Sequence, residues 1–230
     1  MTATDMEIIL PGSSLSFRGG FFGFSAVVLL RHPDAGLILF DTGHHSTRHL
    51  LLAGLKRAGV APAEIRTVFL SHLHFDHIGN AELFEGARFL IPAAEWAYWQ
   101  DPPAADLFGS KPINAWLAQQ NCSFLQEDGE IASGLHWRHA PGHTGGIGLL
   151  HFQDAQGRQI VVAGDACKTY RELVTGQGGE AFDPLGRTAE TLAWIRETAD
   201  VVVCGHHPVL TREGPNWVWE ELTTLELIAR

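Results

Sequence analysis

Residues 67–77 read Thr67-Val68-Phe69-Leu70-Ser71-His72-Leu73-His74-Phe75-Asp76-His77, a short apolar run followed at once by four ligand-type side chains. The first four residues predict a buried strand. On an extended backbone, side chains two residues apart point the same way, so His72 and His74 can bind one ion. A turn after them lets Asp76 and His77 face a second ion. Because imidazole and carboxylate groups are costly to bury without partners, the pattern favours metal binding over core packing.

Three more ligand-type residues occur beside glycine in turns or directly after predicted strands: His143, Asp165 and His206. Glycine allows a close approach of the backbone, and loops at strand ends on a rigid scaffold often carry catalytic groups. These residues extend the predicted metal site. His207 competes with His206 for the last position.

The predicted elements fall into two similar halves, each with strands followed by a helix. Such an order predicts an α/β fold of two sheets packed face to face with helices outside. We expect one domain over residues 1–230, with an aromatic-rich insertion around residues 96–121. The expected strands cover 7–10, 25–30, 37–40, 67–70, 88–91, 134–139, 148–152, 159–163 and 201–204, and the expected helices cover 46–58, a short segment from Asn80, 187–198 and 218–228.

The charge of the chain bears on its partners. Acidic residues number 26 against 16 basic ones, which gives a formal net charge of −10, and no Lys/Arg cluster occurs. A nucleic-acid partner is therefore disfavoured. No apolar run approaches the ~18 residues needed to span a bilayer, and the first residues do not resemble a signal peptide. We expect a cytoplasmic protein that acts on a small molecule and has no membrane partner.

The three cysteines, Cys122, Cys167 and Cys204, are odd in number and show no CxxC spacing. This argues against a disulfide framework and against a thiolate zinc site. Buried free thiols are expected for Cys122 and Cys204. Cys167 lies two residues after Asp165, so it either lines the site or is also buried.

Taken in order, these motifs resemble the metallo-β-lactamase superfamily over nearly the whole chain. The resemblance is carried by the HxHxDH motif at 72–77, by Phe40-Asp41-Thr42-Gly43, by the Pro-Gly-His-Thr turn at 141–144, by Gly164-Asp165 and by Gly205-His206. It implies a four-layer αβ/βα sandwich of two packed mixed β-sheets with outer helices. The metals would lie at one edge of the two sheets.

The same resemblance implies a site with two divalent metal ions, with zinc expected first and iron or manganese as alternatives. It favours His206 over His207, because members of the family place this ligand directly after glycine. Asp41 is expected to orient a ligand histidine. Carried over to this sequence, the ligands are His72, His74 and His143 for one ion, Asp76, His77 and His206 for the other, and Asp165 between the two.

Two close divalent ions can share a water and lower its pKa toward neutrality, which produces a hydroxide nucleophile. One ion can also polarise a carbonyl oxygen. Asp76 is the candidate to pass the proton of the nucleophile to the leaving group. The resemblance implies hydrolysis of a lactone or carboxylic ester with an apolar part, in the manner of the N-acyl homoserine lactonases.

One departure from those lactonases concerns the substrate-contacting residue. They commonly place a tyrosine three residues after the bridging aspartate, where this chain has Lys168. Tyr170 is close enough in sequence to replace that tyrosine, or Lys168 binds an anionic substrate instead. Both are candidate catalytic residues.

The leading alternative is a thioesterase similar to glyoxalase II, whose Pro-Gly-His-Thr turn is alike. The helical domain that binds glutathione in those enzymes has no obvious counterpart after His206. A phosphodiesterase or nuclease fits the charge poorly and lacks the added domain of the RNA-processing relatives. A metal-binding protein without turnover is disfavoured, because the bridging Asp165 is present.

The aromatic residues leave open alternatives. Phe21, Phe22 and Phe24 alternate with glycine and predict either core packing or a mobile hydrophobic flap. The tryptophans of the insertion, Trp96, Trp99 and Trp116, either pack it internally or line an apolar pocket. Trp217 and Trp219 are candidate contacts of a homodimer.

Overall fold

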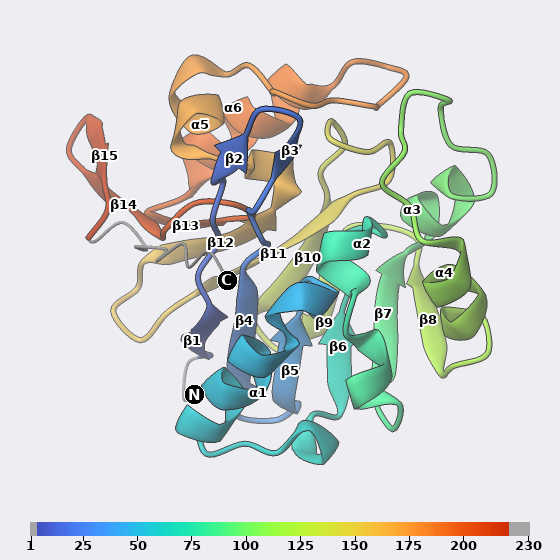
Figure 1. The fold of residues 1–230 in the computed structure, drawn as a ribbon. Coiled ribbons are helices and arrows are strands. Elements are labelled where there is room, and N and C mark those ends of the chain that lie inside the picture. Colours follow the sequence, from blue (N-terminus) through green and yellow to red (C-terminus); the bar gives the residue numbers. More distant parts are fainter. Residues whose placement is uncertain (1–3, 221–230) are drawn as a thin grey trace.

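Two mixed β-sheets face each other in the computed structural model, which describes residues 4–220 (Figure 1). The first sheet has the order β1-β4-β5-β6-β7-β8, in which β4 is antiparallel to both neighbours and β5 to β8 run parallel. Its strands are β1 (Asp5–Leu10), β4 (Val27–His32), β5 (Gly36–Phe40), β6 (Thr67–Phe69), β7 (Arg88–Pro92) and β8 (Cys122–Leu125).

The second sheet has the order β15-β14-β13-β12-β11-β10-β9, and all its neighbours are antiparallel except the parallel pair β12 and β13. A two-stranded hairpin of β2 (Ser16–Phe17) and β3 (Gly20–Phe21) stands apart from both sheets. The strands of the second sheet are β9 (Gly129–Ala132), β10 (Leu135–His139), β11 (Gly148–Gln153), β12 (Gln159–Gly164), β13 (Val201–Cys204), β14 (Leu210–Glu213) and β15 (Asn216–Val218).

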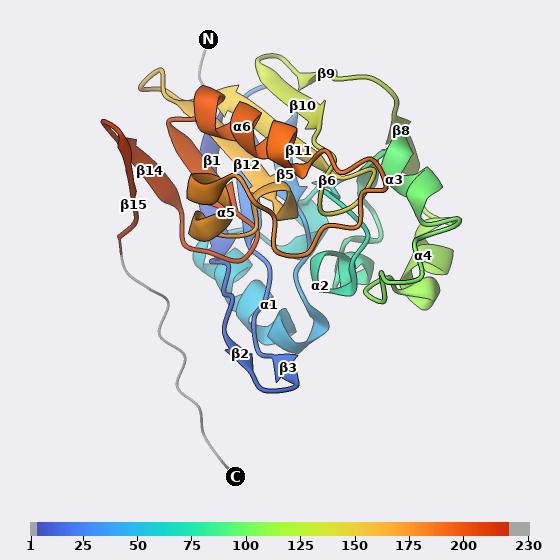
Figure 2. The ribbon, with the colours of Figure 1, turned by 90° about the horizontal axis from the view of Figure 1, so that it is seen from above.

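Helices cover the outer faces of both sheets. Figure 2 shows α5 (Tyr170–Thr175) and α6 (Thr188–Thr198) on one side of the strands and α1 (Arg48–Arg57) on the other. The remaining helices are α2 (Phe75–Ile78), α3 (Ala93–Tyr98), α4 (Lys111–Leu117) and 3₁₀ helices at His45–Thr47, Pro62–Glu64, Ala81–Phe84 and Asp165–Cys167.

The all-apolar strands are explained by burial on both faces. In β12, Ile160 and Val162 point into the core between the sheets, while Val161 and Ala163 pack with Leu192 and Ile195 of α6. Strand β13 alternates in the same way. This alternation makes helix, sheet, sheet and helix four successive layers, which confirms the predicted αβ/βα sandwich.

Strand direction places the ligand-type residues at one edge. Because β5 and β6 are parallel, their carboxyl ends lie together, and Asp41 and the 72–77 motif follow them directly. Parallel β12 and β13 likewise end beside each other, before Asp165 and His206. Ligands far apart in the sequence are therefore adjacent in the fold.

Several predicted elements differ from the structure. The short helix expected from Asn80 is present as the 3₁₀ helix Ala81–Phe84, with Asn80 at its N-cap, whereas α2, which begins inside the motif at Phe75, was not predicted. The helix expected over 218–228 is wrong at Val218, which belongs to β15, and residues 221–228 lie outside the described residues. Strands β8, β9, β14 and β15 were not predicted, because these short segments mix polar and apolar residues without a clear period.

Some of the aromatic residues pack in the core and others are exposed. Phe24 is buried in the core, whereas Phe21 and Phe22 of the β2–β3 hairpin are about half exposed, as a flap would be. Trp96, Trp99 and Trp116 all pack against the core of the first sheet. Trp217 is buried within its own chain, under the guanidinium of Arg212, and its role in a dimer contact stays a prediction.

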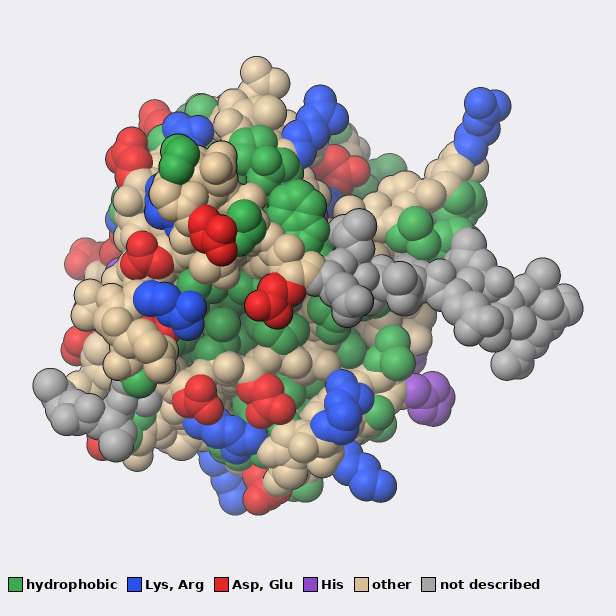
Figure 3. Space-filling view, turned by 90° about the vertical axis from the view of Figure 1, so that its left-hand side faces the viewer, with side chains coloured by type: hydrophobic (Ala, Val, Ile, Leu, Met, Phe, Trp, Pro, Cys, Tyr) green, Lys and Arg blue, Asp and Glu red, His purple; other side chains and the backbone are tan. Residues whose placement is uncertain are grey.

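The face that carries β14, β15 and β1 shows hydrophobic side chains gathered near its middle, with acidic and basic side chains interspersed around them (Figure 3). Trp219 is 36% exposed. Among residues 4–220, no helix has the length and apolar character that crossing a membrane requires.

Candidate metal centre

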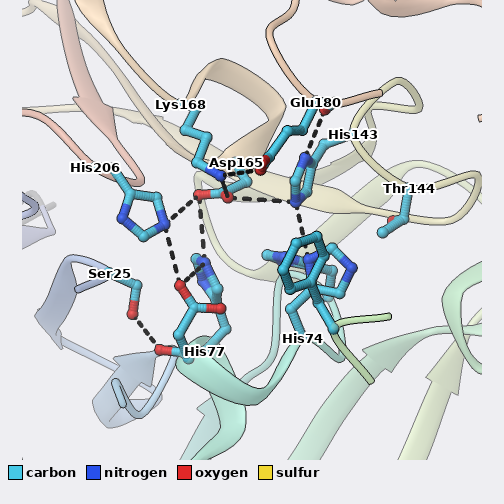
Figure 4. Close-up of polar contacts among 12 residues, drawn as sticks. Ser25, His74, His77, His143, Thr144, Asp165, Lys168, Glu180 and His206 are labelled. Atoms are coloured by element: carbon cyan, nitrogen blue, oxygen red, sulfur yellow. Dashed lines mark hydrogen bonds and ion pairs between the residues drawn. The ribbon is translucent and has the colours of Figure 1, made fainter. Parts of the chain in front are cut away.

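All seven predicted ligand residues converge at the edge of the sandwich (Figure 4). Their potential ligand atoms form three groups, within each of which the atoms lie within 4.8 Å of one another. Two groups match the sets expected from the sequence and the third connects them: His72, His74 and His143; Asp76, His77 and His206; His72, His77 and Asp165. The other candidate, His207, faces its own neighbour, the carbonyl of Pro208, at 3.0 Å.

Three of the histidines direct Nδ1 away from the cluster toward an oxygen. Carboxylate and carbonyl oxygens only accept hydrogen bonds, so in each case Nδ1 carries a proton and Nε2 is the nitrogen directed at the cluster. The bonds run from His77 to Oδ2 of Asp41 (2.7 Å), from His143 to the carbonyl of Glu180 (2.8 Å) and from His206 to the carbonyl of Ser13 (3.2 Å).

His72 is fixed in the same way through a hydroxyl. The Ser71 hydroxyl donates to Oδ2 of Asp41 at 2.7 Å, so its oxygen is free to accept from Nδ1 of His72 at 3.0 Å. Nε2 of His72 then faces the cluster without a proton. The Nε2 atoms of His72, His77 and His206 and Oδ1 of Asp165 are buried and make no hydrogen bond with the residues that the structure describes.

His74 is turned the other way. Its Nε2 donates to both carboxylate oxygens of Asp106 at 3.1 Å, so its Nδ1 carries the lone pair. That Nδ1 lies 2.9 Å from Nε2 of His143, which also lacks a proton. Two lone pairs at this distance repel each other, whereas a cation beside them would be bound by both. This contact is the clearest sign that the residues suit a metal ion.

Asp165 lies between the two groups of histidines. Its Oδ1 is 3.3 Å from Nε2 of both His77 and His206, and its Oδ2 is 3.3 Å from Nε2 of His143. Gly205 leaves the space for this carboxylate, since a Cβ at residue 205 would lie 1.8 Å from Oδ1 of Asp165. The geometry therefore suits a carboxylate shared by two ions.

The two candidate metal positions, one with His143 and the other with His206, differ in charge. Burial lowers the pKa of His143 to about 3. Burial also lowers the pKa of His206, but the carboxylates of Asp165 and Asp76 outweigh it and raise that pKa to about 9. The position with Asp76 thus favours positive charge, whether supplied by a proton or by a metal ion.

Two buried carboxylates near the cluster were missed in the sequence. Glu95 accepts from the amide of Leu73 (2.9 Å), from the indole of Trp99 (2.7 Å) and from the hydroxyl of Thr144 (2.6 Å). It ties the 72–77 motif to the turn that carries His143. Gly146 permits this contact, because a Cβ there would lie 2.1 Å from the Glu95 nitrogen. In the sequence, Glu95 resembles any polar helix residue.

The second missed carboxylate, Asp106, comes from the aromatic-rich insertion. Its side chain is completely buried and accepts from the Tyr98 hydroxyl (2.6 Å) and from the amide of Phe108 (3.1 Å). Burial raises the pKa of Asp106, but the hydrogen bonds from His74 and Tyr98 lower it below its usual value. Asp106 is therefore an ionised acceptor for His74. An aspartate in a Pro/Ala-rich loop gave no sequence signal of this role.

A cavity of about 670 Å³ opens over the cluster. Phe21, Phe75 and Phe108 line it and form one aromatic cluster, with ring centroids 6.2–6.3 Å apart. Asp76 and Asp165 also line the cavity. Ligand-type side chains and an apolar surface therefore face the same space.

Both sequence candidates for substrate contact also line this cavity. Nζ of Lys168 lies 3.6 Å from Oδ2 of Asp165 and 2.7 Å from Oε2 of Glu180. Burial lowers the pKa of Lys168, but these two carboxylates raise it above its usual value, so the amine is charged. The ring of Tyr170 packs against Trp219 at 4.9 Å.

The thiols take no part in the cavity lining that the described residues form. Cys167 is buried with its Sγ 3.8 Å from Sγ of Cys204, so both are buried free thiols. Cys122 is only partly buried.

Comparisons with known proteins agree with this geometry. The family model described as the metallo-beta-lactamase superfamily matches residues 20–206. "Metallo-beta-lactamase domain-containing protein 1" of Xenopus laevis is 31% identical over 210 residues, which cover 88% of this chain and 79% of that protein. "N-acyl homoserine lactonase AiiB" of Agrobacterium fabrum is 31% identical over 168 residues, or 66% of this chain and 60% of that protein.

Among solved structures, a mutant of B. thuringiensis AiiA with N-decanoyl-L-homoserine bound at its active site superposes with a TM-score of 0.73. It is 19% identical, and the match covers 95% of this chain and 100% of the other. At this identity the likeness supports the fold alone.

Proposed function

Because the chain belongs to the metallo-beta-lactamase superfamily, we propose that it is a dinuclear metal-dependent hydrolase that cleaves a lactone or carboxylic ester with an apolar part. The observation that carries the proposal is the shared cavity, which is lined by five of the seven ligand-type residues and by a cluster of phenylalanines. A polar reacting group at the ligands and an apolar chain along the rings would both be satisfied.

Divalent ions bound there would supply a nucleophile at neutral pH and polarise the substrate carbonyl. The ligands that would hold one ion are His72, His74 and His143. Asp76, His77 and His206 would hold the other, with Asp165 between them. Zinc is the first candidate, because a set of imidazoles with two carboxylates suits it, and iron and manganese are the alternatives.

Asp76 is the proposed proton carrier. Its carboxylate lines the cavity, and its Oδ2 lies 3.2 Å from Nε2 of His206. Burial raises the pKa of Asp76, but His77 and His206 lower it below its usual value, so the group is an ionised acceptor. We expect it to take the proton of the attacking water and to deliver it to the leaving oxygen.

Lys168 and Tyr170 are proposed to contact the substrate. The Lys168 ammonium faces the cavity beside Asp165, where it can donate a hydrogen bond to a substrate oxygen that gains negative charge. Tyr170 lines the same cavity and can direct its hydroxyl at the substrate. The half-exposed Phe21, on the β2–β3 hairpin, would cover the apolar part.

A hydrolysis panel tests the substrate class. The zinc-loaded protein should cleave acyl-homoserine lactones or simple carboxylic esters faster than a glutathione thioester, a β-lactam and a phosphodiester. Faster cleavage of the thioester would favour the glyoxalase II-like alternative. Rapid phosphodiester cleavage with inert lactones would overturn the proposal.

The variant Asp76→Asn tests the chemistry in the same assay. Removal of the proton carrier should lower kcat by roughly 10²- to 10⁴-fold. Metal content must be measured alongside, because Asp76 is also a proposed ligand. The matched control is Asp34→Asn, which makes the same change on an exposed turn.

A further inference from the structure

We propose that Asp106, held by Tyr98, is a positioning residue that fixes the ring of His74 and thereby sets the metal affinity of the three-histidine position. The proposal rests on the metal centre described above. It assigns a function to the aromatic-rich insertion, whose Asp106 accepts a hydrogen bond from a candidate metal ligand.

The contact decides which nitrogen of His74 faces the cluster. Both oxygens of Asp106 lie 3.1 Å from Nε2, so the proton is held there and Nδ1 is left to bind a cation. The other four histidines hold their proton on Nδ1 and present Nε2. Without an acceptor at Nε2, His74 would place its proton on either nitrogen. Every molecule with the proton on Nδ1 would lack one metal ligand.

Asp106 is itself held firmly. The Tyr98 hydroxyl donates to Oδ2 at 2.6 Å, and the amide of Phe108 donates to Oδ1 at 3.1 Å. The backbone of the same loop pairs with the motif, since the amide of Phe75 donates to the carbonyl of Phe108 at 2.9 Å. A β-bridge joins His74 to Gly109. The carboxylate and the ring that it orients are therefore part of one small unit.

The His74 ring is also confined by aromatic neighbours. Trp99 and Phe108 meet it edge-on, with ring centroids 5.6 Å and 5.4 Å away. These contacts limit rotation of the ring but do not choose its protonated nitrogen. Among the described residues, the hydrogen bond to Asp106 is the contact that holds the proton on Nε2.

The effect should be confined to one metal position. The hydrogen bonds of Asp106 go to His74, Tyr98 and Phe108, whereas the outward nitrogens of His77 and His206 are held by Asp41 and Ser13. Loss of the Asp106 carboxylate thus removes support from the position of His72, His74 and His143 alone.

The test is zinc titration of the metal-free protein against a chromophoric chelator, which resolves the two binding steps. For Asp106→Asn we expect one affinity to fall by roughly 10- to 100-fold and the other to stay within about twofold. Tyr98→Phe removes only one bond to the carboxylate and should weaken the same step by roughly threefold. The control is Asp101→Asn, an exposed aspartate of the same insertion, which should change neither step.

Cobalt(II) absorption provides a readout that a purely structural role would not change. The d–d bands of the weakened position should shift in Asp106→Asn, while the melting temperature of the metal-free protein stays close to wild type. Equal weakening of both steps, or no change in either, would overturn the proposal. If Asp106→Asn fails to fold, Tyr98→Phe decides alone in the same titration. The titration uses no substrate, so its result does not depend on whether the protein hydrolyses lactones.

Discussion

Asp41 and Asp106 each accept a hydrogen bond from a candidate ligand histidine, Asp41 from Nδ1 of His77 and Asp106 from Nε2 of His74, but they come from different parts of the fold. Asp41 ends the central strand β5, is completely buried, and accepts from both the amide and the hydroxyl of Ser71 at 2.7 Å. Asp106 lies in the loop between α3 and α4 and borders a second cavity of about 620 Å³. The next residue of that loop, Leu107, is 81% exposed.

This difference in location separates a contribution to folding from a contribution to metal binding. Asp41 joins β5, the motif and His77, and it does so in a left-handed backbone conformation (φ 57°) that a non-glycine residue adopts only when its surroundings enforce it. Its loss should damage the fold as well as the metal position. Asp106 joins a peripheral loop to one histidine, so its loss should act mainly on metal binding. The pair of Asp41 and His77 (the inner pair) should therefore affect folding, whereas the pair of Asp106 and His74 (the outer pair) should affect metal affinity.

The largest effect is expected from Gly205→Ala, which attacks the group common to both positions. A Cβ at residue 205 would lie 1.8 Å from Oδ1 of Asp165, so the shared carboxylate must move. Both metal positions should be weakened together, with fewer than one ion retained per chain after dialysis. Elemental analysis of the dialysed protein measures this.

The control for that substitution is Gly129→Ala, because the nearest atom to a Cβ at residue 129 is 4.0 Å away. It should retain as much metal as wild type. If Gly205→Ala lost only one ion, Asp165 would not be shared by the two metal positions. The assignment of ligands to each position would then be wrong.

The second effect, Asp41→Asn, tests the inner pair. The NH2 of the new amide group would face either Nδ1 of His77 or the backbone amide of Ser71, which are both donors, so one buried bond is left unmade in either orientation. We expect a loss of about 3 kcal/mol in the free energy of unfolding of the metal-free protein. Urea denaturation measures it.

Asp106→Asn should cost only about 1 kcal/mol in the same experiment, because its loop carries less of the core. Equal losses in the two variants would contradict the separation between the inner and outer pairs.

The smallest effect is the release of protons on metal binding. In the metal-free protein the pKa of His206 is about 9, so its imidazole is protonated at pH 7.5. A metal ion must displace that proton, so binding at the second position should release about one proton or more. His143, with a pKa of about 3, has no proton to lose at this pH.

Calorimetry in buffers of different ionisation enthalpy counts these protons. Acidification should weaken the position of His206 first, since its pKa is the higher one. Proton release confined to the three-histidine step would show that the charges of the two positions are assigned the wrong way round.

The sequence predicted the layers well, and the ligand-type residues that it singled out lie together in the structure, for physical reasons. Runs such as Val201–Cys204 are apolar on both faces, and only strands buried between a helix layer and a second sheet require this. The ligands were recognisable because each is a costly polar residue placed directly after such a strand or in a glycine turn. The structure brings these residues together, and their roles as ligands stay a prediction.

What the sequence did not predict depends on contacts between distant segments. Asp106 and Glu95 are ordinary acidic residues until the fold places one against His74 and the other between Leu73 and Thr144. Local patterns carry no information about which loop will meet which turn. Helix α2 was not predicted for a similar reason, because backbone bonds to the loop of Phe108 and to Asp41's neighbour Thr42 shape the motif.

The bond from His206 to the carbonyl of Ser13 spans 193 positions of the chain. During synthesis from the N-terminus, the three-histidine position has its three imidazoles once residue 143 has left the ribosome, and it lacks only the shared Asp165. The second position must wait for residue 206, which then closes onto a segment made near the start. Metal acquisition in a nascent chain should therefore be stepwise, and the second ion can enter only after the two sheets have come together.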